Sequence, residues 1–236
     1  MNAGKVIGLA AVPHSGTWFR AVNPGFISTA ISTTHSKTIA SRFSPASPAN
    51  PGFEILYLAE NHLVAMFEAQ ALFGSPLTPG GVVPHPTASL VTLAIHVQLS
   101  LVVDLSDPAQ ATLVDTSAQE LTGDWRGYQQ RGSATSVTGP TGKAPTQELG
   151  EQLFALCPTI QGFLTLSARL PYYKILGIFT QRLSTGIDYV RYSITGQSQP
   201  IQIPYTTASL TVVGILTTMP GGRFHKRGFR SERRVR

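Results

Sequence analysis

The sequence predicts an α+β domain in which strands outnumber helices. Two observations lead to this class: a long stretch at 91–103 in which every second residue is apolar, and strand-like and helix-like segments that follow one another in no regular order. A regular strand–helix alternation, which would predict a parallel α/β sheet, does not occur. With 236 residues, of which 42% are apolar, the chain can form one large domain, or one domain with an appendage.

The first third of the chain predicts two strands and one helix. Thr17–Val22 is rich in aromatic and β-branched residues and predicts the first strand, whereas the Pro, Gly, Ser and Thr residues of 23–52 predict a loop. Ile55–Leu58 is a short apolar strand. Asn61–Phe73 predicts a helix with a wide apolar face, and Gly and Pro residues end it and begin a loop over 74–86.

The strongest periodicity lies at Val91–Val103, where every second residue is apolar. Period two over this length predicts one long strand with one buried face. His96 falls on the opposite face, so we expect its ring to be solvated.

The second half predicts a polar surface excursion at 124–143 and a helix at Gln147–Cys157, for which Thr146 is the expected N-cap. Two strands follow at Phe163–Ser167 and Lys174–Phe179. Further strand-like segments are Tyr189–Ile194, Ile201–Tyr205 and Leu210–Thr218.

The net charge of +6 resides at the C-terminus. Arg223–Arg236 contains seven Lys or Arg residues and one Glu, so the rest of the chain is neutral. A solvated, flexible tail is the simplest interpretation, and contact with nucleic acid or an acidic partner is the alternative. The body of the protein offers no general basic field for nucleic acid.

Composition also bears on the compartment. The single cysteine, Cys157, excludes an internal disulfide and a thiolate metal cluster, which favours a reducing cytoplasm. The longest apolar runs are too short to cross a bilayer. Val6–Val12 is about as short as the apolar region of a signal peptide can be, so we expect none.

Common catalytic motifs are missing. The sequence has no G-x-G-x-x-G turn and no G-x-S-x-G elbow, and its six histidines lack metal-ligand spacing. Gly139–Lys143 resembles part of a phosphate loop, but Val137 and Ala144 occupy positions that the motif assigns to Gly and to Ser or Thr.

Five residues are candidates for a site. Glu68 projects from the apolar stripe of its helix, where a carboxylate must be paired or face a cleft. Arg42 is a loop arginine, which is usually a surface residue but can bind phosphate oxygens through its planar donors. Arg20 lies inside an apolar strand and either faces solvent or points into a site. Tyr57 is a core residue or stacks on a flat ligand, and Ser167 ends a strand.

Taken together, these residues match a family pattern. TWFRAV carries Arg20, SRFSP carries Arg42, ILYLAENHLVAMFEAQ carries Tyr57 and Glu68, and GFLTLSAR carries Ser167. Over residues 15–180 the chain resembles the RES-domain toxins, a family named for an arginine, a glutamate and a serine, here Arg42, Glu68 and Ser167.

The resemblance implies an ADP-ribosyltransferase-like split β-sheet with flanking helices. It places a RES-like NAD-binding domain at 15–180, and we expect a β-rich extension packed on it at 181–222 and the flexible basic tail at 223–236. NAD would be a substrate rather than a cofactor, in agreement with the missing dinucleotide turn.

The resemblance further implies a bacterial toxin that cleaves the nicotinamide–ribose bond of NAD by hydrolysis, phosphorolysis or ADP-ribosyl transfer. Glu68 would support the ribose cation, Arg42 and Arg20 would bind the pyrophosphate, Tyr57 would pack on the nicotinamide or ribose, and Ser167 would orient the substrate. The implied partner is an antitoxin with a helix-turn-helix DNA-binding module. The alternatives are a nucleic-acid-associated protein that acts through its tail, and a degenerate RES fold kept as a binding module.

Overall fold

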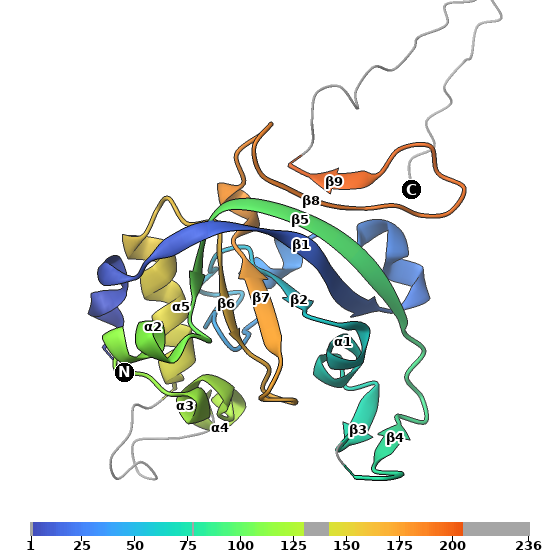
Figure 1. Cartoon of the computed structure of the whole chain (residues 1–236), viewed down its shortest axis with the longest axis horizontal. Helices are drawn as coiled ribbons and strands as arrows, with labels where there is room; N and C mark the ends of the chain where they lie inside the picture. Colours follow the sequence, from blue (N-terminus) through green and yellow to red (C-terminus); the bar gives the residue numbers. More distant parts are fainter. Residues whose placement is uncertain (1, 77, 130–141, 205–236) are drawn as a thin grey trace, which may run out of the picture. The chain divides into compact units, whose positions relative to one another are not determined.

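The computed structural model describes residues 2–76, 78–129 and 142–204, so the predicted strand at 210–218 and the basic tail at 223–236 lie outside the described residues. One seven-stranded sheet organises this part, in the order β1-β2-β7-β6-β5-β8-β9 (Figure 1). Its strands are β1 (Ala11–Val22), β2 (Leu56–Ala59), β5 (Val91–Asp104), β6 (Gly162–Leu166), β7 (Lys174–Ile178), β8 (Tyr189–Tyr192) and β9 (Ile201–Ile203).

Short helices and one small hairpin surround this sheet. The α-helices are α1 (His62–Glu68), α2 (Pro108–Leu113), α3 (Ala118–Thr122), α4 (Trp125–Gln129) and α5 (Pro145–Leu156). The 3-10 helices are η1 (Ala3–Gly8), η2 (Pro24–Thr29), η3 (Thr34–Lys37) and η4 (Thr180–Arg182). β3 (Leu72–Gly74) and β4 (Val82–Pro84) pair as the separate hairpin.

The sheet closes on itself through its two longest strands. β1 and β5 pair antiparallel along their whole length, from Ala11 opposite Val103 to Val22 opposite Val91. β1 joins β2 through one residue pair, Phe19 opposite Ala59. The strands β1, β2, β7, β6 and β5 therefore form a ring, and its β1–β2 junction is the weakest seam. The β1–β5 ribbon arches over β2, β6 and β7 (Figure 1).

Alternation along the strands separates two environments. Leu56 and Leu58 of β2 join the main apolar core, which also includes residues of β1, β5, β7 and β8. Tyr57, between them, points to the other face and packs beside two further apolar clusters. Side chains alternate between the faces of a strand, so this register fixes which β2 residue can reach a site on the outer face.

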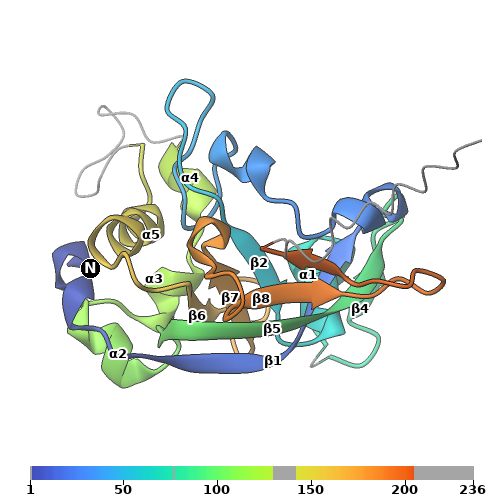
Figure 2. The same ribbon diagram turned by 90° about the horizontal axis from the view of Figure 1, so that it is seen from above.

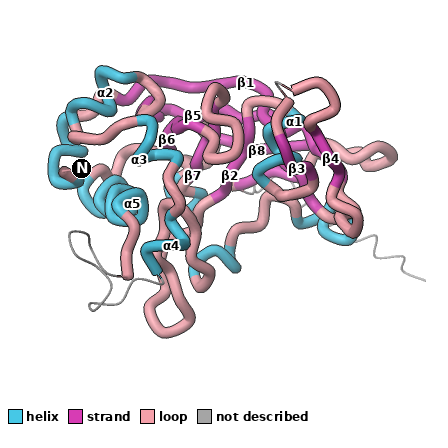
Figure 3. Tube along the Cα trace, turned by 90° about the horizontal axis from the view of Figure 1, so that it is seen from below, coloured by secondary structure: helices cyan, strands magenta, loops and turns pink. Residues whose placement is uncertain are grey.

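The helices lie at the two ends of the ribbon. α2, α3, α4 and α5 gather at one end, and α1 and the β3–β4 hairpin lie at the other, as the three views agree (Figures 1, 2 and 3). Leu149 and Leu153 of α5 pack with Phe163 of β6 at the first end. Val64 and Phe67 of α1 pack at the second end.

The long strand predicted at 91–103 is confirmed, and His96 is exposed, with a hydrogen bond to Thr17. The first strand starts earlier than predicted, at Ala11. The helix predicted over 61–73 is shorter, because Gln70 takes a left-handed backbone conformation, with φ of 58°, and the chain then enters the hairpin.

Two further expectations are corrected. α5 has Ala144 as its N-cap rather than Thr146, which is buried, and Pro145 occupies the first helical turn. The segment expected as a surface excursion from residue 124 begins with α4.

The strands expected at 189–194 and 201–205 are present as β8 and β9, and β8 pairs directly with β5. Within the described residues, no helix is both long and apolar enough to traverse a bilayer. The same residues contain no cluster of His, Cys, Asp and Glu suited to a metal ion.

Candidate active site

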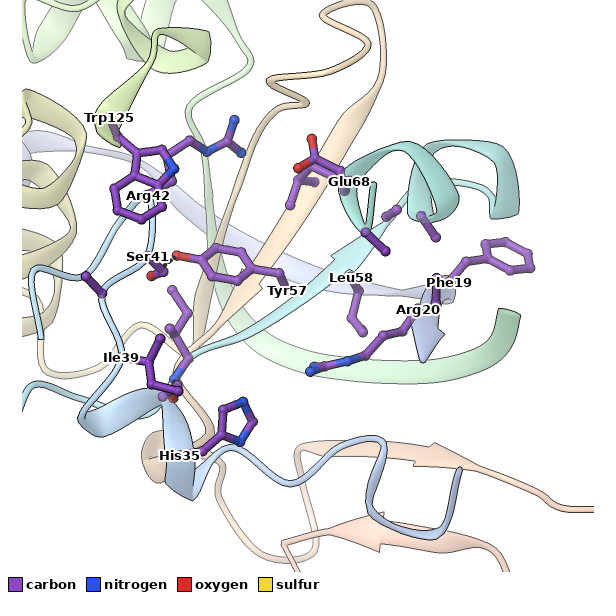
Figure 4. Close-up of a pocket in the computed structure, with 18 of the residues that line it drawn as sticks. Phe19, Arg20, His35, Ile39, Ser41, Arg42, Tyr57, Leu58, Glu68 and Trp125 are labelled. Atoms are coloured by element: carbon purple, nitrogen blue, oxygen red, sulfur yellow. Dashed lines mark hydrogen bonds between the residues drawn. The ribbon is translucent and has the colours of Figure 1, made fainter. Parts of the chain in front are cut away.

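A cavity of about 400 Å³ opens beside the single residue pair that joins β1 to β2. This volume lies in the usual range of small-molecule sites. Its walls come from β1, η3 and the segment after it up to Arg42, β2, α1 and α4 (Figure 4). Four of the five predicted site residues line it: Arg20, Arg42, Tyr57 and Glu68. Side chains from four separate segments therefore meet in one place.

Glu68 is the last residue of α1, so its carboxylate lies at the negative end of the helix dipole. Two hydrogen-bond donors offset the unfavourable interaction of the carboxylate with the helix dipole. The Ser167 hydroxyl donates to Glu68 Oε1 at 2.5 Å, and the backbone N–H of Ala168 donates to the same oxygen at 3.0 Å. No described residue donates to Oε2. The carboxylate is fixed through one oxygen, and the other is available for a ligand.

Ser167, the fifth predicted residue, does not line the cavity. Its side chain is fully buried, and besides donating to Glu68 its hydroxyl accepts from the backbone N–H groups of Arg169 and Leu170, at 3.2 and 3.0 Å. A hydroxyl committed to these three partners cannot also contact a ligand. Ser167 therefore contacts Glu68 and its own turn but not the cavity, whereas the family resemblance implied a contact with the substrate, which stays a prediction.

Arg42 is buried although it comes from a loop, because the segment folds back against β2 and α5. Its side chain is 7% exposed, and its Nη1 has no hydrogen-bond partner among the described residues. Burial lowers the pKa of Arg42, while the nearby Glu68 and Tyr57 partly restore it. No ion pair joins Arg42 to Glu68 in the described part of the chain. A buried guanidinium with a free donor is costly unless a ligand completes it.

Arg20 lines the cavity from β1, so its side chain does not simply face bulk solvent. Burial lowers its pKa to about 10, so the guanidinium stays charged at neutral pH. No described carboxylate pairs with it. In the view of Figure 4, Arg20 and His35 lie on one side of the Tyr57 ring, and Arg42 and Trp125 lie on the other.

Tyr57 reaches across the cavity floor toward the Arg42 loop. Its hydroxyl lies 3.0 Å from the Ser41 hydroxyl and accepts the backbone N–H of Phe43 at 3.2 Å. Burial raises the pKa of Tyr57 to about 12, so the phenol is neutral at physiological pH. Its aromatic face is offered to a planar group, and its hydroxyl holds the loop.

The charges of the lining suit an anionic ligand with one cationic or electron-poor centre. Three guanidinium groups, those of Arg20, Arg42 and Arg126, outweigh the single carboxylate of Glu68. Arginine donors match phosphate oxygens in geometry. A carboxylate held rigidly beside them can stabilise a positive charge that develops during a reaction.

Sequence reasoning missed part of the lining. Trp125 and Arg126 of α4, His35 of η3 and Ile39 of the loop that follows it also line the cavity. The Arg126 guanidinium lies 5.4 Å from the centre of the Trp125 ring. The sequence signal for Trp125 was a large aromatic residue in an otherwise polar, Gly-rich segment. Such a segment has little core of its own in which the ring could pack.

Comparisons with known proteins bear on the family and the fold of this chain. The family model of the RES domain matches residues 17–203. Among solved structures, the chain is similar to one in the crystal structure of the M. tuberculosis MbcT–MbcA toxin–antitoxin complex, with a TM-score of 0.56 and 19% identity. That match covers 85% of this chain and 91% of the other. No curated protein matches the chain.

Proposed function

The chain belongs to the RES domain family, and on this basis we propose that it is a toxin that cleaves the nicotinamide–ribose bond of NAD. One observation supports this most: a carboxylate anchored through one oxygen shares a cavity with the guanidinium groups of Arg20 and Arg42, neither of which has a carboxylate partner in the described part of the chain. NAD presents the complementary groups, a diphosphate and a ribose that becomes cationic when nicotinamide leaves.

The chemistry requires little from a general acid. The nicotinamide ring of NAD is already cationic, so it departs as a neutral molecule without protonation. Positive charge then develops on the ribose, and Glu68 would stabilise it more strongly in the transition state than in the ground state. Arg42 and Arg20 would bind the diphosphate. Tyr57 and Trp125 would supply flat apolar surfaces for the nicotinamide or ribose.

Ser167 would act through Glu68 rather than on NAD. Its hydroxyl keeps the carboxylate in position against the unfavourable end of α1. A fixed carboxylate needs no reorganisation when the ribose charge appears, which is the source of its catalytic effect.

The direct test is a time course of NAD breakdown by the purified protein, with products identified by mass spectrometry. Water, inorganic phosphate and a protein mixture are supplied as acceptors in separate reactions. We expect nicotinamide release in at least one of them, and a loss of about 10²–10³-fold in rate for Glu68→Gln, as for other transition-state electrostatic contacts. Intact NAD in all three reactions would refute the proposal.

We further propose that an antitoxin with a helix-turn-helix module binds this toxin over the cavity. The structurally similar chain belongs to a toxin–antitoxin complex. At the cavity rim, Ile39 is 58% exposed, and a partner covering the entrance would bury this side chain. Expression of the toxin alone should arrest bacterial growth and lower cellular NAD. Co-expression with a regulator encoded beside it should restore both, and continued arrest would contradict this part of the proposal.

A further inference from the structure

The position of Arg42 is set by a tight loop rather than by bonds to its own side chain. The backbone N–H of Ser41 donates to the Ser44 carbonyl at 2.7 Å, and the N–H of Ser44 donates to the Ser41 carbonyl at 3.2 Å. Arg42 and Phe43 form the tip between them. Arg42 Nη1 has no hydrogen-bond partner among the described residues, and the guanidinium carbon lies 5.2 Å from the centre of the Phe43 ring at the same tip, so the conformation of this loop sets where the guanidinium lies.

Gln147 of α5 holds both ends of that loop. Its Nε2 donates to the Ser41 carbonyl at 2.9 Å and to the Ser44 carbonyl at 3.4 Å. Its Oε1 accepts the backbone N–H of Ala144 at 3.0 Å. Backbone carbonyls can only accept and an N–H can only donate, so these partners determine which way the amide faces. The Gln147 side chain is fully buried, which makes its polar atoms costly to leave unpaired.

Gly150 lets α5 come close enough for this contact. It lies one turn after Gln147, on the same face of the helix. A Cβ built on Gly150 would lie 1.9 Å from the Phe43 carbonyl oxygen, well inside any tolerated contact. The other side of the loop is held by Tyr57, whose hydroxyl accepts the Phe43 N–H. The loop is therefore clamped between α5 and β2.

We propose that Gln147 is a positioning residue for Arg42, and that it keeps the guanidinium directed into the cavity beside Glu68. This proposal rests on the proposed function only where its test measures KM and kcat for NAD. Gln147 is not among the residues that line the cavity, so any effect on NAD must pass through the loop.

The test compares Gln147→Met with Gln152→Met, the same change in the same helix at a half-buried residue whose side chain makes no hydrogen bond to the described chain. We expect Gln147→Met to raise the KM for NAD about tenfold with a smaller change in kcat, because diphosphate binding is shared by the ground and transition states. Gln152→Met should leave both constants unchanged.

A double-mutant cycle distinguishes positioning from general support. In an Arg42→Ala background, Gln147→Met should add no further rise in KM, since the group that it positions is gone. Additive effects in the two backgrounds would overturn the proposal. If Gln147→Met does not fold, Gln147→Glu, which keeps the shape and the acceptor but loses both donors, takes its place in the cycle.

A second measurement is independent of NAD. Hydrogen exchange of the Ser41 and Ser44 amides should be faster in the Gln147 variant than in the wild type and in Gln152→Met. Equal exchange in all three proteins would refute the clamp. If the amide exchange rates differ between the variants as expected but the wild type does not cleave NAD, the proposed function is refuted, whereas the role of Gln147 in holding the loop is supported.

Discussion

Replacing Ser167 by alanine removes the hydroxyl that donates to Glu68 Oε1 at 2.5 Å and leaves the carboxylate with the Ala168 N–H alone. A hydrogen bond to a charged group contributes about 1.5–3 kcal/mol. The same change deprives the Arg169 and Leu170 N–H groups of their acceptor. Because the site is fully buried, we expect a loss of about 2–3 kcal/mol in the free energy of unfolding.

The effect on catalysis follows from the freedom given to Glu68. If the carboxylate loses about 1.4–2.8 kcal/mol of transition-state stabilisation, kcat for NAD cleavage falls about 10–100-fold. The assay is the rate of nicotinamide release at saturating NAD, with stability measured separately by urea unfolding. In a Glu68→Gln background, adding Ser167→Ala should lower kcat little further, because the two residues act as a unit.

Ser100 provides a matched control. Its hydroxyl donates to Asp188 Oδ1 at 2.7 Å, and its own backbone N–H donates to the same oxygen at 2.8 Å. This pair reproduces the chemistry of Ser167 with Glu68 but lies away from the cavity. Ser100→Ala should lower stability and leave kcat unchanged. A Ser167→Ala protein that folds and retains wild-type kcat would refute the role assigned to Ser167.

Two further predictions concern the scaffold around the cavity. Gly150→Ala should lower the melting temperature strongly, because the new methyl group overlaps the Phe43 carbonyl. Gly8→Ala is the control and should have little effect, because its methyl group meets nothing within 4 Å. Equal melting temperatures for the two variants would contradict the close approach of α5 to the loop. Burial opposes ionisation of Glu54, but hydrogen bonds from Thr33, Lys37 and Thr180 more than offset it and lower its pKa. The stability that ionised Glu54 contributes is therefore present above pH 4.5, its ordinary pKa, and is lost as the pH falls through the lowered pKa. Urea unfolding across that range should show that the free energy of unfolding falls less for Glu54→Gln than for the wild type.

Elements whose signal is local could be predicted from the sequence alone. The alternation at 91–103 records one-sided burial, so β5 could be predicted without any knowledge of its partners. The strands β6 and β7 and the helix α5 follow from the same kind of pattern. The family resemblance, spread over distant segments, was enough to predict that Arg42 and Glu68 belong to one site.

Packing between distant segments set what local patterns do not record. Nothing in the residues of β1 specifies that it pairs with a strand some eighty positions later, nor that a cavity opens where it meets β2. The apolar residues after Glu68 predicted that the helix continues to Phe73. In the structure the backbone turns at Gln70, and the residues from Leu72 onward pair in the β3–β4 hairpin instead. Trp125 lines the cavity because α4 packs beside the Arg42 loop, whereas the Ser167 hydroxyl is enclosed by Glu68 and its own turn. Burial and periodicity are properties of neighbouring residues, whereas a site depends on contacts between distant segments, and those are fixed only when the whole chain packs.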